Sequence, residues 1–129
     1  MHKGFLQTAA ILGALAVALG AFGAHGLKKI VPPETVTTFE TGVRYQFYHV
    51  FALLAVAVLF GNFPGKYLQY AGVCFIIGIV LFSGSLYVLT ILQATKTVGL
   101  RGIGAITPIG GLFFIIGWIF LLLAVWRKA

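Results

Sequence analysis

The sequence predicts an all-α membrane protein: a compact bundle of four transmembrane helices with a short interfacial helix between helices 1 and 2. Hydrophobic residues make up 60% of the 129-residue chain and charged residues only 9%, and the mean hydropathy is +1.07. Soluble domains carry about 25% charged residues, and one of this size could not bury so much apolar surface. Four long, nearly uncharged segments alternate with short polar connections. We therefore expect a single transmembrane domain over residues 1–129.

The first two spans differ in how clearly they are marked. Residues 4–24 carry no charge, and about 21 residues at about 1.5 Å each cross a hydrocarbon core of about 30 Å. The basic start of this segment also suits a signal peptide, but its length favours a retained span. The second uncharged run covers only residues 45–60. A second span over residues 40–60 therefore requires the helix to begin among polar residues.

The third and fourth spans are expected at residues 67–92 and 103–126, within uncharged stretches that are longer than a span needs. The Asn62-Phe-Pro-Gly65 sequence predicts a tight turn before the third span, and polar residues 93–101 predict a short hinge after it.

The longest connection, between the first and second spans, contains two prolines and an acid. Pro33 and Glu34 suit the first turn of a helix, where no backbone N–H is needed and negative charge is favourable. We therefore expect residues 33–38 to form the short interfacial helix.

Charge indicates a membrane surface as the partner. The net charge is +7, and the basic residues lie mainly at the ends of the apolar segments, where they suit anionic lipid headgroups. No basic helix face suits nucleic acid, so we expect membrane lipids as partners, with a membrane-protein partner or a homo-oligomer as further options. Basic residues divide almost evenly between the two sides, so the orientation stays open.

Small residues recur at helical spacing in the first segment. Ala10, Ala14 and Ala18 form one row, and Ala16, Gly20 and Ala24 form another. Helices in lipid associate closely where small residues let the backbones approach. Both rows therefore predict tight packing, without indicating a particular function.

Polar residues cluster at the start of the second span. At 100° per residue, Glu40, Arg44 and Tyr48 fall within about 80° of one another, and Tyr45 and His49 belong to the adjoining stripe. Ionisable groups at membrane depth should face the bundle interior or a wet cavity. The Glu40–Arg44 spacing suits a helical ion pair, and the alternative is a headgroup, anion or proton site.

Two histidines allow several interpretations. His49 suits a hydrogen bond to a neighbouring helix or a proton-handling role. His25, at the exit of the first segment, lies on the same side and raises the idea of a bis-histidine haem, but no surrounding sequence suggests a porphyrin slot. Two histidines and the distant Cys74 are too few for zinc. We expect no cofactor and no metal, and Cys74 suits core packing.

Hydroxyl residues and a proline complete the candidate site. Ser83, Ser85 and Tyr87 lie in the third segment, and Thr107 precedes Pro108, which with nearby glycines predicts a helix break. The polar residues of all four segments then gather near one membrane face in a shallow pocket. Its candidate residues are His25, Glu40, Arg44, Tyr45, Tyr48, His49, Ser83, Ser85, Tyr87 and Thr107.

These blocks also carry a family resemblance. GAFGAHGL (residues 20–27), FETGVRYQFYH (39–49), FSGSLY (82–87) and GAITPIGG (104–111) resemble the motif blocks of the domain-of-unknown-function 423 family of small four-span membrane proteins. The resemblance covers essentially the whole chain. It implies a bacterial inner-membrane location and a shared site, but no activity.

The function expected from the sequence is binding rather than catalysis. The chain offers no nucleophile with a base, no carboxylate pair and no metal cluster. We expect a non-enzymatic accessory, assembly or lipid-binding protein. The alternative is a small channel or proton-coupled carrier that uses Arg44 and His49.

Overall fold

The computed structural model describes residues 1–63, 65–96 and 101–126. Four helical segments in it are long and apolar enough to cross a membrane: Lys3–Lys29, Pro33–Leu59, Tyr67–Ala94 and Gly102–Trp126. The predicted fold class is confirmed. Pro64 and residues 97–100, which belong to the predicted turn and hinge, lie outside the described residues.

Helix α1 runs from Lys3 to His25 and is capped by His2, whose Nδ1 accepts a hydrogen bond of 2.9 Å from the Phe5 N–H. Its buried face is a row of small residues at seven-residue spacing, Ala9, Ala16 and Gly23. Of the two rows predicted from the sequence, Ala10, Ala14, Ala18 and Ala24 are exposed, and only Ala16 is buried. The prediction chose the wrong stripe because small residues occur all around this helix, and only the partner determines which ones are used.

The connection from α1 contains the one-turn 3-10 helix η1, Leu27–Lys29, and α2 then runs unbroken from Pro33 to Leu59. The predicted interfacial helix over residues 33–38 is therefore the first part of α2 itself. Pro33 occupies the first helical turn and Glu34 comes directly after it, so the start signals were read correctly but assigned to a separate helix.

The third span combines three elements. Helix α3, Tyr67–Gly78, passes into a π-helical turn at Ile79–Ser83, labelled η2, which continues as α4, Gly84–Ala94. No pattern in the sequence predicted this π turn. In the turn preceding α3, Gly61 and Gly65 have φ angles of +92° and +88°. Residues other than glycine rarely adopt such positive φ angles.

The fourth span opens with the 3-10 turn η3, Arg101–Ala105, and continues as α5, Ile106–Trp126. Pro108 lies in the first turn of α5, where a missing N–H breaks no helical hydrogen bond. The expected helix break at Pro108 is therefore wrong. Further along, a Cβ at Gly110 would collide with the backbone of Phe82, so α5 lies directly against the π turn.

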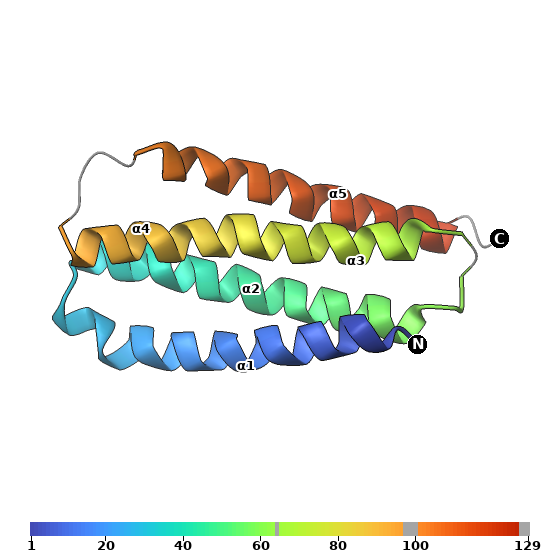
Figure 1. The fold of residues 1–129 in the computed structure, drawn as a ribbon, viewed down its shortest axis with the longest axis horizontal. Helices are drawn as coiled ribbons and strands as arrows, with labels where there is room; N and C mark the ends of the chain where they lie inside the picture. The colour runs from blue at the N-terminus through green and yellow to red at the C-terminus, as the bar shows by residue number, and fades with distance from the viewer. Residues whose placement is uncertain (64, 97–100, 127–129) are drawn as a thin grey trace.

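The helices lie side by side in the order α1, α2, α3 with α4, and α5 (Figure 1). The second and third spans form the centre: 50% and 39% of the residues in their most apolar windows are buried, against 17% and 22% in the first and fourth. The main core is built around Phe5, Leu53 and Phe75. As a result, α1 and α5 each present a wide face to the surroundings.

Candidate functional site

His49 is the one ionisable side chain buried within the spans among the described residues, with 4% of its surface exposed. It comes from the middle of α2 and packs against α5, where its ring stacks on Phe114 at 3.5 Å between centroids and 6° between planes. Phe75 of α3 packs against the same ring at 5.6 Å. Three helices therefore hold the imidazole in one orientation.

The two ring nitrogens of His49 have different partners, which define its protonation state. Nδ1 lies 2.8 Å from the Tyr45 carbonyl oxygen, and Nε2 lies 3.1 Å from the Trp118 indole Nε1. A carbonyl oxygen only accepts and an indole N–H only donates. The ring is therefore neutral, with its proton on Nδ1 and the Trp118 N–H donating to Nε2.

Next to His49, a groove of about 710 Å³ lies between α2 and α5. Its walls are mainly aromatic: Tyr45, Tyr48, His49, Phe82, Phe114 and Trp118. The rest of its lining is Pro108, Gly111, Leu112 and Ile115. The groove begins near the start of α5 and continues to the middle of both helices, where the surrounding medium of a membrane protein is hydrocarbon.

Two of the predicted site residues form the rim of this groove. Tyr45 and Tyr48 are 37% and 51% exposed, and their rings meet edge to face at 5.4 Å. Neither phenol hydroxyl has a hydrogen-bond partner within the described residues. Hydroxyls surrounded by hydrocarbon gain from an acceptor, so this rim favours a ligand that carries one.

Two hydroxyls of the third span form hydrogen bonds to α2. Ser83, which is fully buried in the π turn, donates to the Gly42 carbonyl at 2.6 Å. The Tyr87 hydroxyl donates to Gln46 Oε1 at 2.6 Å, and Gln46 Nε2 donates to the Leu12 carbonyl of α1 at 2.7 Å. This chain of bonds joins α1, α2 and α4.

A second hydroxyl pair joins the third and fourth spans. Ser85 Oγ donates to the Phe82 carbonyl at 2.8 Å and lies 2.5 Å from Thr107 Oγ1. Because the one Ser85 proton is used on the carbonyl, Thr107 is the donor of the second bond. Every buried side-chain N or O atom in the described part of the chain has a partner, so these bonds fasten helices together.

The structure does not assemble the ten predicted residues in one pocket. His25, Glu40 and Arg44 are exposed, and no ion pair joins Glu40 to Arg44. We expected these charges inside the bundle, but long charged side chains can instead extend along the helix toward the interface. His49 lies just beyond the centre of α2, and its expected location near one membrane face stays a prediction.

Two important residues were missed. Gln46 is the central residue of α2 and only 2% exposed. An amide inside a predicted membrane span needs internal partners, so the position of Gln46 in the second span was enough to mark it as a candidate. Trp118 was missed because it lies within a long apolar segment, and the acceptor of its indole N–H on α2 is identified only by the packing of the helices.

Comparisons with known proteins agree with a membrane protein. The family model described as "Protein of unknown function (DUF423)" matches residues 19–111. The chain is 45% identical over 123 residues to the UPF0382 membrane protein YwdK of Bacillus subtilis, a match that covers 95% of each chain. It is 42% identical to a UPF0382 membrane protein of Haemophilus influenzae, covering 92% of this chain and 90% of the relative. No solved structure shows a significant match.

Proposed function

The chain belongs to the family described as "Protein of unknown function (DUF423)", whose relatives are named as membrane proteins, and from this premise we propose that it is a non-enzymatic lipid-binding protein of the bacterial inner membrane. In this proposal the groove between α2 and α5 holds an acyl chain of a membrane lipid. The observation that carries it is an aromatic groove of about 710 Å³ beside the spans' hydrocarbon-facing surface.

The chemistry of the groove favours an acyl chain over a polar ligand. Its walls are aromatic and aliphatic, and its most polar group, His49, already uses both nitrogens within the protein. The hydroxyls of Tyr45 and Tyr48 remain free to donate a hydrogen bond. In a bilayer, the ester carbonyl of a lipid can serve as the acceptor. An acyl chain with its ester at this rim therefore satisfies both parts of the site.

Catalysis lacks support from the same contacts. The hydroxyls of Ser83 and Ser85 donate to backbone carbonyls, so neither is activated by a base. The carrier alternative requires Arg44 and His49 on one polar path. Arg44 is exposed while His49 is buried against α3 and α5, so the two side chains face different surroundings.

The proposal is tested by filling the groove. A Cβ at Gly111 would meet only the ring of Phe82 at 3.8 Å, an ordinary contact, so Gly111→Leu occupies the groove without displacing the backbone. Gly104→Leu is the matched control, because a Cβ there meets no atom within 4 Å. Native mass spectrometry in mild detergent, with phosphatidylcholine as the only added lipid, counts the lipids that each chain retains.

We expect the parent and Gly104→Leu to retain a phospholipid, and Gly111→Leu to retain it at least about fivefold less because apolar contact area is lost. Circular dichroism melting confirms that each variant is folded. Equal retention in a folded Gly111→Leu protein would refute the proposal. So would a lipid-free dimer that Gly111→Leu converts to a monomer, because a second copy would then occupy the groove.

A further inference from the structure

A second cavity, of about 340 Å³, lies between η1 and the first turns of α2. Its apolar floor is formed by Val31 and Val36, which are 8% and 7% exposed. It lies where the first span ends and the second begins. In a bilayer this is the depth of the lipid headgroups.

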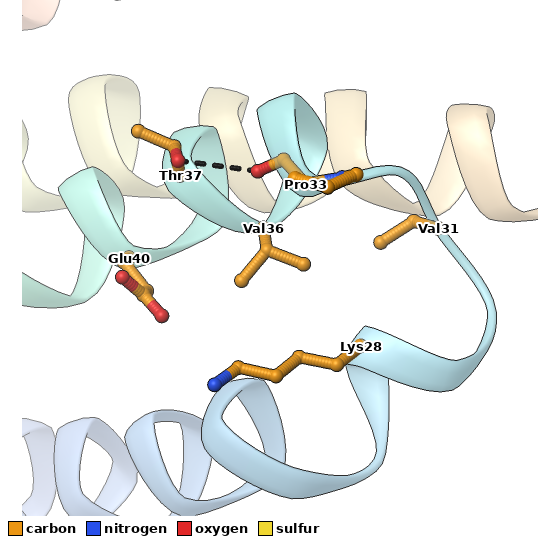
Figure 2. Close-up of a pocket in the computed structure, with 6 residues that line it drawn as sticks. All are labelled: Lys28, Val31, Pro33, Val36, Thr37 and Glu40. Carbon is orange, nitrogen blue, oxygen red and sulfur yellow. Dashed lines mark hydrogen bonds between the residues drawn. The ribbon is translucent and has the colours of Figure 1, made fainter.

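Two opposite charges face each other across this cavity. Figure 2 shows the extended Lys28 side chain along one side and the Glu40 carboxylate on the other, each directed toward the space between them. They form no ion pair with each other, and Arg44, one turn beyond Glu40, forms none with the carboxylate either. Both charged groups therefore keep their hydrogen-bonding capacity for a ligand.

The third polar group at the cavity is already committed. Thr37 Oγ1 donates to the Pro33 carbonyl at 3.1 Å (Figure 2). The Thr37 hydroxyl proton is therefore not available to a ligand. The groups that remain to bind one are the Lys28 ammonium and the Glu40 carboxylate, with an apolar floor between them. A cation and an anion held apart across a small cavity complement a zwitterion whose charges have the opposite order.

We propose that this cavity binds the headgroup of a zwitterionic phospholipid with a primary ammonium, of the phosphatidylethanolamine class. Lys28 contacts the phosphate, and Glu40 accepts hydrogen bonds from the ammonium. Charge-assisted hydrogen bonds of this kind are stronger than neutral ones. A choline headgroup has no N–H to donate, and an anionic headgroup without an amine leaves Glu40 facing negative charge, so both fit less well.

This site is separate from the acyl-chain groove and does not depend on it. The test uses the same lipid-retention measurement with dioleoyl lipids that differ only in the headgroup: ethanolamine, its mono- and dimethyl derivatives, choline and glycerol. The phosphate and acyl chains stay constant in the amine series while the N–H donors are removed one by one. The ratio of ethanolamine to choline lipid retained is the readout.

Matched variants isolate the two charges. Glu40→Gln removes the carboxylate charge at constant shape, and Glu34→Gln is its control, because Glu34 lies in the same helix but does not line this cavity. Lys28→Met removes the ammonium, and its control is Lys29→Met on the adjacent residue of η1.

We expect the parent and both controls to prefer ethanolamine over choline lipid by about fivefold to tenfold, with retention falling stepwise on methylation. Glu40→Gln should bring this ratio to about one, while Lys28→Met should reduce retention of both lipids. A ratio near one in the parent protein would refute the proposal, and stronger retention of the glycerol lipid would show an anion site instead. Displacement by millimolar glycerophosphoethanolamine would overturn the assignment to a membrane lipid. Failure of this preference leaves the groove test, carried out in phosphatidylcholine, unaffected.

Discussion

Removing the hydroxyl of Tyr87 should destabilise the bundle by about 1–2 kcal/mol. Tyr87→Phe keeps the ring but leaves Gln46 Oε1 without its donor at 2.6 Å. Gln46 is only 2% exposed, and an unsatisfied buried acceptor costs about 1–3 kcal/mol. Hydrogen bonds between membrane helices average about 0.6 kcal/mol and reach about 1.7 kcal/mol, so the expected loss lies in the lower part of that range.

A double-mutant cycle separates this bond from other effects. Gln46→Leu removes the acceptor, so adding Tyr87→Phe to it should cost much less than Tyr87→Phe alone. The difference is the coupling energy, expected at about 0.6–1.7 kcal/mol. Reversible unfolding by sodium dodecyl sulfate in mixed micelles gives the four free energies of unfolding.

The matched control is Tyr70→Phe, which removes the same atom from a side chain that is 44% exposed. It should change the free energy of unfolding by less than about 0.5 kcal/mol. If Tyr87→Phe behaves like this control, or if the two changes at positions 46 and 87 simply add, the hydrogen-bonded link between α2 and α4 does not stabilise the fold.

Two further pairs of substitutions test helix contacts by the same unfolding measurement. Gly110→Ala should lower the free energy of unfolding by at least about 2 kcal/mol, because its Cβ meets backbone that cannot move aside. At Gly84 a Cβ meets no atom within 4 Å, so Gly84→Ala should be neutral or stabilising by up to about 1 kcal/mol. Ala16→Leu, on the buried face of α1, should cost about 1–3 kcal/mol, and Ala14→Leu on its exposed face should stay within about 0.5 kcal/mol. Similar losses within either pair would contradict the assigned packing faces.

The sequence was sufficient for the fold class because that conclusion depends on length and composition alone. An uncharged segment as long as residues 4–24 has few alternatives to a span, whatever its neighbours are. Helix starts were also readable, since Pro33 and Glu34 act through their own backbone and charge. Whether such a start opens a separate helix or a long one depends on the residues after it, and here the prediction divided one helix into two.

The candidate site was harder to predict because it depends on which face meets which helix. Angular position on α2 correctly grouped Tyr45 with His49, which share the groove. It could not show that Arg44 faces outward or that Glu40 faces Lys28 across a different cavity. The identity of the Trp118 partner likewise required the packing of α5, which no local pattern in the sequence records.

The π turn at Ile79–Ser83 has a consequence for how the third span reads along its length. One extra residue per turn offsets everything after it by about 100° around the axis. Gly78, before the offset, lies against Phe114 of α5, while Ser83 at its end reaches the Gly42 carbonyl of α2. A single helical wheel drawn through the whole span therefore assigns the residues of either α3 or α4 to the wrong face. Deleting one residue here would rotate the side chains of α4 about the helix axis relative to those of α3, while leaving the composition of the span almost unchanged.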